Sequence, residues 1–210
     1  MKFILKKMKK WNTFYLLLAV VLVIVILKTS CMGEQKQDEA TLKSKVVLEN
    51  IAERKSVRKY LNRSVEEDKI DAMVKAGMAA PSGMDRRPWE FVVVTDRVVL
   101  DSMAAKLPYA KMLTGAPLAI VVCGDTTRSS YWYLDCSAAT QNVLLAAEAL
   151  GLGAVWTAAY PYEDRIDVVR QNTGLPEHIV PLCVIPIGYP DGPQKVKDKF
   201  DPQRVHRNKY

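Results

Sequence analysis

The sequence predicts an α+β fold in which a mixed β-sheet is sandwiched between helices. Apolar runs of strand length alternate along the chain with longer segments that have the period of an amphipathic helix. The alternation lacks the regularity of repeated βαβ units, so a purely parallel sheet is not expected. Of the 210 residues, 49% are hydrophobic and 25% are charged. This composition is that of a globular chain and excludes a disordered, a collagen-like or a polytopic membrane protein.

The helices are predicted from capping and from spacing. Ser64-Val65-Glu66-Glu67 is a capping-box pattern, in which the Ser64 hydroxyl and the Glu67 carboxylate satisfy reciprocal backbone donors. A helix should therefore run from about Val65 to Ala79. The other segments of helical character are residues 42–53, 98–106, 129–150 and 162–173.

Four apolar runs are predicted to be buried strands. These runs are residues 90–95, 118–123, 154–159 and 180–187. The helix predicted over 129–150 has apolar residues nearly all round, and a helix of that kind must be buried on every side. In a body of this size it is either a central helix or part of a subunit interface.

The basic charge of the chain belongs to its N-terminus. The net charge is +7, and residues 1–32 hold six of the 30 basic residues and none of the 23 acidic ones. The remaining residues, 33–210, therefore have a net charge of only +1. A nearly neutral body of this kind predicts no nucleic-acid partner.

Residues 1–32 are predicted to be a signal or membrane-anchor segment. Five lysines in the first ten residues precede an apolar run from Phe14 to Leu27. The positive-inside tendency places the following domain on the extracytoplasmic side. Cys31 follows small residues, as in a bacterial lipoprotein signal, so lipidation, an uncleaved anchor and simple cleavage all remain open. A polar tether over 33–45 then leads to a single domain over 46–210.

Cysteine and histidine spacing gives no metal or nucleophile site. Cys123, Cys136 and Cys183 lie in apolar surroundings without a CxxC pair and are predicted to be small buried hydrophobic residues. His178 and His206 stand in no recognised catalytic spacing. Any chemistry is therefore expected to be carried by a cofactor.

Three cations and a hydroxyl are packed into Arg54-Lys55-Ser56-Val57-Arg58. Arginine offers a rigid fork of donors that matches phosphate oxygens, so this run is suited to bind an anion. A solvated charged turn is the commoner role of such a run in isolation.

Three further segments favour the anion-binding role over the solvated turn. The run 79–91 combines small residues with a Pro-Trp pair ahead of an apolar strand, which allows close approach of a flat ligand. Gly151-Leu152-Gly153 provides another close-approach turn after the long helix. Ile187-Gly188-Tyr189-Pro190 ends the last strand, before a lysine-rich tail.

With these segments in this order, residues 46–210 resemble the nitroreductase family of FMN-dependent flavoproteins. The resemblance implies FMN as cofactor, NAD(P)H as electron donor, and an intertwined homodimer in which both chains hold the flavin. The FMN-binding residues that it implies are Arg54, Lys55, Ser56 and Arg58 near the phosphate, Pro81, Ser82, Gly83 and Asp85 around the ring and ribityl chain, Thr157 and Ala158 at the reactive edge of the ring, and Lys197 and Lys199 near the phosphate. No side chain is expected to be catalytic, because flavin N5 carries the chemistry.

The sequence departs from the family pattern at two positions. The family commonly has Asn where Asp85 stands and Gln where Arg87 stands. An ionised Asp can only accept hydrogen bonds, so either the flavin contact is altered or Arg86 or Arg87 neutralises the carboxylate.

The expected function is a membrane-tethered oxidoreductase that passes electrons from NAD(P)H through FMN to a nitroaromatic, a quinone or another small-molecule acceptor. One alternative is a reductive dehalogenase that resembles iodotyrosine deiodinase, although the 26 residues between Phe91 and Leu118 leave little space for that family's charged lid. Another alternative is a non-catalytic flavin-binding envelope lipoprotein.

Overall fold

The computed structural model describes residue 38 and residues 41–210. The predicted signal or anchor segment, 1–32, and most of the predicted tether lie outside these residues. Residues 41–53 are helical, so the last part of the tether, 41–45, belongs to a helix. In the described part of the chain no helix combines the length and the apolar character needed to cross a bilayer.

The chain divides into two units, Met1–Glu49 and Asn50–Tyr210. In its described residues the first unit is helical and exposes Leu42, Val46 and Leu48 to solvent. The second unit begins four residues later than the predicted domain and contains the whole β-sheet.

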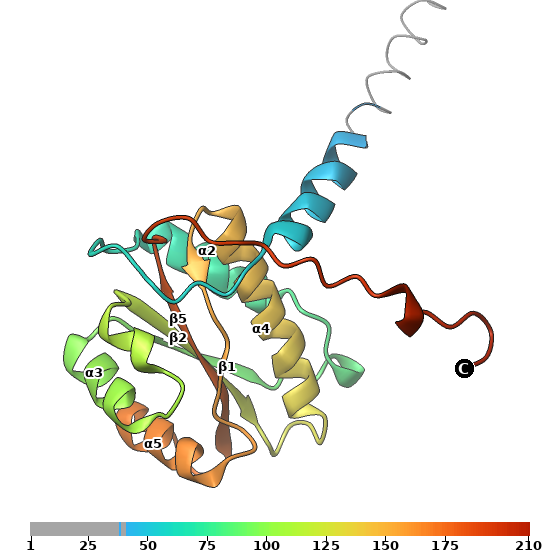
Figure 1. Cartoon of the computed structure of the whole chain (residues 1–210). Coiled ribbons are helices and arrows are strands. Elements are labelled where there is room, and N and C mark those ends of the chain that lie inside the picture. Colours follow the sequence, from blue (N-terminus) through green and yellow to red (C-terminus); the bar gives the residue numbers. More distant parts are fainter. Residues whose placement is uncertain (1–37, 39–40) are drawn as a thin grey trace, which may run out of the picture. The chain divides into compact units, whose positions relative to one another are not determined.

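The sheet is built around two long central strands, β2 and β5 (Figure 1). The order of the strands is β1-β2-β5-β3, and β4 also pairs with β5. All of these pairings are antiparallel, and the parallel component is a bridge between Ser56 and Ala154. The strand bounds are β1 Trp89–Val94, β2 Leu118–Asp125, β3 Gly153–Ala154, β4 Thr157–Ala158 and β5 Ile179–Gly188.

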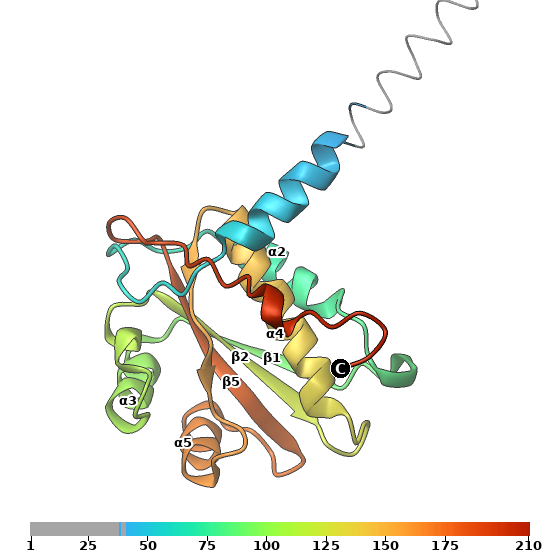
Figure 2. The ribbon, with the colours of Figure 1, turned by 45° about the vertical axis from the view of Figure 1, so that its right-hand side comes forward.

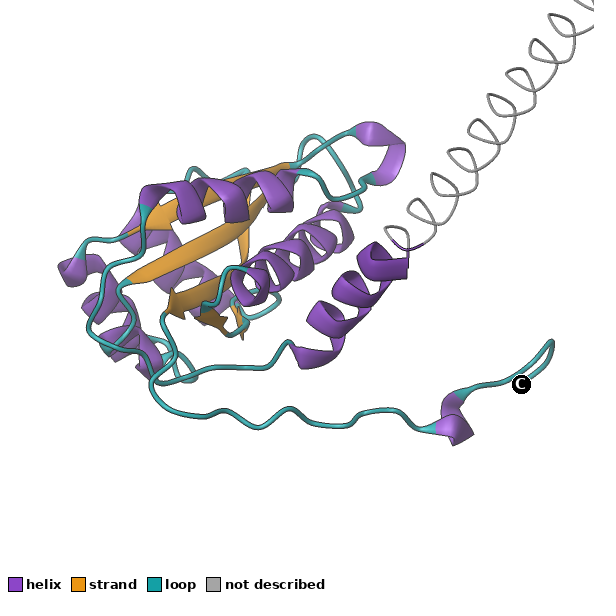
Figure 3. Cartoon of the chain, turned by 90° about the horizontal axis from the view of Figure 1, so that it is seen from above, coloured by secondary structure: helices purple, strands orange, loops and turns teal. Residues whose placement is uncertain are grey.

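Helices cover both faces of the sheet. In Figures 1 and 2, α3 and α5 lie on one side of the strands and α4 lies on the other, with α2 packed against α4. The view from above in Figure 3 shows the strands between these helices. The bounds are α2 Glu67–Met78, α3 Arg97–Lys106, α4 Trp132–Ala149 and α5 Glu163–Thr173. The predicted α+β class, with a sheet sandwiched between helices, is confirmed.

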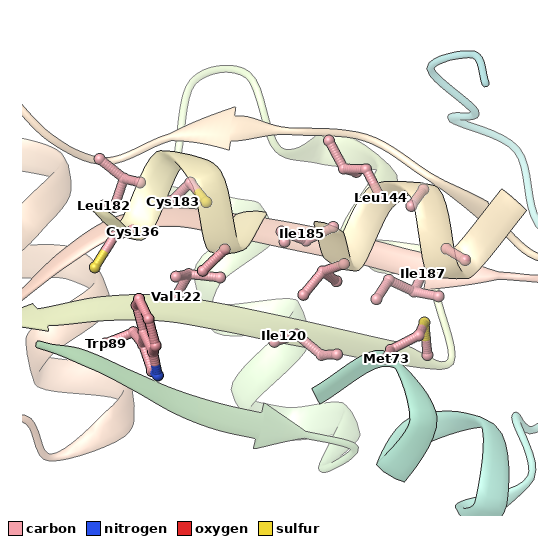
Figure 4. Packing of buried hydrophobic residues seen from close by; sticks show 14 of the residues in the cluster. Met73, Trp89, Ile120, Val122, Cys136, Leu144, Leu182, Cys183, Ile185 and Ile187 are labelled. Carbon is pink, nitrogen blue, oxygen red and sulfur yellow. The ribbon is translucent and has the colours of Figure 1, made fainter. Parts of the chain in front are cut away.

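The two layers have separate apolar cores. Because successive side chains of a strand point to opposite faces, β2 sends Ile120 and Val122 into one core and Ala119 and Val121 into the other. The core under α2 and α4 is shown in Figure 4, where residues of β5, such as Ile185, pack with those of β2. All three cysteines of this unit are buried, as predicted, and burial raises the pKa of the Cys183 thiol to about 12.

The predicted capping box does not form. Helix α2 begins at Glu67, its N-cap residue is Glu66, and no side chain caps it. The Glu66 carboxylate instead accepts hydrogen bonds from the Tyr189 hydroxyl (2.6 Å) and from Arg63 (2.7 Å). A tertiary contact with the end of β5 thus replaces the local motif.

The predicted strand over 154–159 is two short strands. β3 and β4 each contain two residues, and residues 155–156 between them belong to neither. Both strands pair with β5, at Ile187–Gly188 and at Cys183–Val184. A single continuous strand was therefore wrong, although the segment does line the edge of the sheet.

Helix α4 is not buried on every side within one chain. Cys136, Ala139 and Val143 are fully buried against the sheet, whereas Leu134 is 55% exposed. Its hydrophobic character therefore exceeds what packing within the single chain uses.

The contact between Tyr189 and α2 predicts acid sensitivity. Hydrogen bonds from Tyr189 and Arg63 lower the pKa of Glu66 to about 2, below its ordinary value of 4.5. The stabilisation is therefore complete above pH 4.5 and is lost as the pH falls towards 2. In urea unfolding between pH 7 and pH 2.5, Glu66→Gln should show a weaker loss of stability with acid than the unmodified chain. Glu67→Gln, on the adjacent residue, is the control and should retain the full pH dependence, and equal slopes for all three proteins would contradict the prediction.

Candidate active site

The Arg54–Arg58 segment is held against the edge of the sheet by a single β-bridge. The Val57 amide donates to the Ala154 carbonyl (3.0 Å), and Ser56 bridges to the same residue. A Cβ on Gly153 would lie 2.5 Å from the Cβ of Val57, so only glycine permits this approach. Because side chains alternate, buried Val57 faces inward and leaves Ser56 and Arg58 exposed.

This segment forms one wall of a small basic cavity. The cavity has a volume of about 170 Å³. It is lined by Arg54, Lys55, Ser56, Arg58, Lys195, Lys197 and Lys199. The sequence assigned six residues to the binding of a phosphate. The structure brings these six together, although they come from two segments about 140 positions apart. Sequence reasoning missed Lys195, although it lies in the same lysine-rich tail.

The cations of this cavity differ in their pairing. Lys55 donates to a Glu148 carboxylate oxygen (2.7 Å), so its charge is already balanced. Arg54 and Arg58 have no side-chain hydrogen bond or ion pair among residues 41–210, and the same holds for the three tail lysines. Five uncompensated cations and the Ser56 hydroxyl around a small cavity are suited to a phosphate dianion, which accepts several charge-assisted hydrogen bonds.

A second cavity, of about 430 Å³, adjoins the basic one and shares Arg58 with it. Thr157 and Ala158, which the sequence placed at the reactive edge of a ring, line this cavity. The Thr157 hydroxyl donates to the Val184 carbonyl (2.7 Å) and is therefore engaged within the sheet.

Several residues of the second cavity have no signal in the sequence. They are Tyr109, Lys111, Met112, Trp156 and Arg165. Lys111 and Met112 lie in the 3₁₀ helix η2, Lys111–Thr114, and Arg165 lies in α5. Only the folding of η2 and α5 against the β4 edge brings these side chains to one place.

The remaining predicted site residues form a strained loop elsewhere. The Gly83 amide donates to Asp135 (2.9 Å), and the Arg87 amide donates to the Ser82 hydroxyl (3.0 Å). Met84, Asp85 and Arg87 have φ values of 53°, 55° and 47°, in the left-handed region that non-glycine residues rarely adopt. Each such residue costs about 1–3 kcal/mol, so the surrounding hydrogen bonds must hold the loop.

Arg87 neutralises Asp85 within this loop. The Arg87 Nε and Nη2 atoms donate to the two carboxylate oxygens at 2.7 and 2.5 Å. These bonds lower the pKa of the Asp85 carboxyl, which is therefore ionised at neutral pH. Of the two outcomes expected for the departures from the family pattern, neutralisation by an adjacent arginine is the one observed.

The loop and the two cavities lie at opposite edges of the sheet. The loop precedes β1, which is one edge strand, whereas the cavities adjoin β3 and β4 beyond β5. With neighbouring strands about 4.8 Å apart, three strand spacings separate the two edges by about 14 Å. One chain therefore does not place Pro81, Ser82, Gly83 and Asp85 in the same site as Arg54 and Thr157.

The fold and the cavities define an α+β protein with a phosphate-sized basic site joined to a larger partly apolar cavity. The model of the nitroreductase family matches residues 51–107 and 99–189. The chain belongs to the nitroreductase family.

Named relatives agree with this assignment. A Methanothermobacter thermautotrophicus protein with the provisional name NADH dehydrogenase/NAD(P)H nitroreductase is 47% identical over 78% of this chain and 87% of its own. A crystal structure of a Bacteroides thetaiotaomicron protein with the same provisional name is 68% identical, covers 79% of this chain and 98% of its own, and has a TM-score of 0.78. A nitroreductase-like structure from Desulfovibrio desulfuricans in complex with FMN is 27% identical, covers 78% of this chain and 97% of its own, and has a TM-score of 0.68.

Asp135 should be needed to hold the strained loop. Its side chain is 6% exposed and accepts from both the Gly83 amide and the Ser129 hydroxyl (3.1 Å). Asp135→Ala leaves these two donors without this acceptor and should destabilise the fold by about 1–3 kcal/mol in urea unfolding. Hydrogen exchange at residues 83–87 should accelerate as well.

Asp135→Asn is the matched control for this prediction. It keeps an acceptor oxygen for the Gly83 amide, so its loop amides should exchange at a rate close to that of the unmodified chain. Faster exchange spread evenly over α4 and the loop in Asp135→Ala would contradict a specific role in holding the loop.

Proposed function

We propose that the protein is an FMN-dependent oxidoreductase that passes electrons from NAD(P)H to a nitroaromatic, a quinone or a similar small-molecule acceptor. The observation that carries this proposal is the pair of adjoining cavities, one sized and charged for a phosphate and the other larger and partly apolar. Arg58 lines both, so a ligand with a phosphate at one end and a ring at the other can span them. The FMN complex of the Desulfovibrio relative supports the same cofactor.

The residues present fit such a cofactor. Arg54, Ser56 and the tail lysines would hold its phosphate, and the backbone of residues 155–158 would face its ring. When bound, FMN supplies a carrier that takes up hydride at N5 and gives the electrons to an acceptor. Arg58 lines both cavities, and its positive charge there would favour a cofactor that becomes negatively charged on reduction.

The second half of the cofactor site is proposed to come from another copy of the chain. The loop at Ser82–Arg87 lies at the β1 edge, away from the cavities of its own chain. A homodimer would bring the loop of one subunit to the cavity of its partner. The exposed side chains on α4 and in the tail, such as Leu134 and Phe200, provide apolar surface for that association.

The dehalogenase alternative gains no support from the segment after β1. Residues 95–117 contain α3 and η2, and Leu100, Met103 and Leu113 of this segment are fully buried. These elements pack into the core beneath the sheet and therefore do not form an extended lid. No feature of the described residues favours a non-catalytic flavin-binding role over catalysis.

A proposal for the localisation of the domain rests on the sequence of residues 1–32. We propose that this segment anchors the domain at the membrane, with the domain on the extracytoplasmic side, as the lysines before the apolar run indicate. Because NAD(P)H is a cytoplasmic reductant, a domain on the extracytoplasmic side would need a different electron donor. Protease accessibility of the domain in intact cells tests the orientation, and a domain protected from protease would have access to NAD(P)H.

Arg54→Ala tests the phosphate site directly. Each charge-assisted hydrogen bond is worth about 1.5–3 kcal/mol, so the loss of this guanidinium should weaken FMN binding by about tenfold or more. The measurement is a titration of the flavin-free protein that follows flavin fluorescence. Lys75→Ala removes a cation that pairs with Asp71 on α2, outside both cavities, and should leave the affinity unchanged. Equal affinities for Arg54→Ala and the unmodified chain would assign Arg54 to the solvated surface.

A further inference from the structure

The larger cavity has lining residues that the proposed cofactor contacts do not use. Arg58 and residues 155–158 are the lining residues assigned to the cofactor. Three further residues line the same cavity. Tyr109 lies in the turn before η2, Lys111 lies in η2 and Arg165 lies in α5. Since these residues have no role in holding a phosphate in the basic cavity, they are available to a second ligand.

The charged residues that line this cavity all have the same sign. Arg58, Lys111 and Arg165 are the charged residues of the lining, which contains no acid. None of the three has an ion-pair partner in the part of the chain that the structure describes. The Lys111 ammonium donates to the Ala105 carbonyl at a long 3.3 Å. A cavity whose charged residues are all cations favours a ligand with negative charge.

Arg165 is held in place by aromatic rings and has unused donors. Its guanidinium carbon lies 3.7 Å from the ring centroid of Tyr162 and 5.2 Å from that of Tyr109. Nη1 reaches the Ala158 carbonyl at 3.4 Å, Nε is buried without a partner, and Nη2 makes no hydrogen bond within the described residues. A fixed guanidinium whose Nη2 group is unpaired can donate to a carboxylate oxygen.

The uncharged residues that line this cavity are suited to a flat apolar ligand. Tyr109 is 71% exposed at the cavity, and Trp156 and Met112 are partly buried beside it. Aromatic side chains stack on flat rings, and methionine adapts to their edges. The lining therefore combines a surface for a ring with cations for an anionic substituent.

We propose that this cavity, beside the cofactor, binds a carboxylate-bearing aromatic molecule as electron acceptor, with Arg165 and Lys111 as the residues that select the carboxylate. The inference rests on the proposed function, because it names the class of acceptor that the cofactor site serves. The anionic phosphates of the nicotinamide donor share this chemistry, so the experiment separates the two sources.

The test compares two probes of similar shape, 4-nitrobenzoate and 4-nitrobenzyl alcohol. Their dissociation constants for the full-length, FMN-loaded protein are measured by calorimetry and by the change in flavin absorbance. The carboxylate should bind about tenfold more tightly than the alcohol, as expected for one charge-assisted contact. Arg165→Gln and Lys111→Gln should each reduce this preference severalfold and change the affinity for the alcohol by less than about twofold.

Arg170→Gln is the matched control. Arg170 also lies on α5 and also has a buried Nε without a partner, but it pairs with Asp167 and does not line the cavity. This variant should keep the full preference for the carboxylate. A loss of preference in Arg170→Gln equal to that in Arg165→Gln would overturn the assignment, because the effect would then come from α5 as a whole.

The outcomes distinguish this inference from the proposed function. If the loaded protein reduces both probes and binds them equally, the acceptor assignment fails and the oxidoreductase function stands. If the protein retains no FMN, the proposed function fails, and calorimetry with the flavin-free chain still decides whether an Arg165-dependent preference exists. If Arg165→Gln weakens NADP⁺ binding and leaves 4-nitrobenzoate unaffected, the anion belongs to the donor, and the assignment to the acceptor is overturned.

Discussion

The close approach of Val57 to Gly153 is the constraint on which the site depends. Because glycine has no Cβ, the Arg54–Arg58 segment can bridge to Ala154 and continue the sheet beyond β3. That pairing buries Val57 and turns Ser56 and Arg58 outward, so one backbone contact orients the hydroxyl and the cations together. The Tyr60 hydroxyl adds bonds to the carbonyls of Val57 and Pro186, which tie the end of the segment to β5.

The two halves of the candidate site are stabilised in different ways. The cavity side is a regular sheet edge with uncompensated positive charge, whereas the loop side is a strained backbone held by a buried carboxylate. Positive charge without a partner repels itself, and left-handed residues cost free energy, so both halves carry an energetic cost that the two apolar cores must offset. Such costs are typical of positions where a ligand, and not stability, determines the residues.

Charge pairing decides which of the basic residues can serve a ligand. Lys55 and Arg87 resemble their neighbours in the sequence, yet each is bound by a carboxylate, Glu148 and Asp85 respectively. Arg54 and Arg58 have no such partner among residues 41–210, so their charge is available in the small cavity and, through Arg58, in the larger one. Arg165 adds a further cation to the larger cavity, where aromatic rings and not acids hold it.

The fold class, most element positions and the family could be predicted from the chain alone, because period, glycine placement and short motifs are local properties. Through resemblance the sequence also predicted six of the seven residues that line the basic cavity, Lys195 being the exception. Three features required the folded structure: Tyr189 replaces the capping box at α2, the strand at 154–159 is two short strands, and Lys111 and Arg165 line the same cavity as Thr157. Each of these depends on segments far apart in the chain, whose approach is governed by packing against β5 and the two cores. The separation of the 82–87 loop from the cavities is also a property of strand order, which no local pattern encodes.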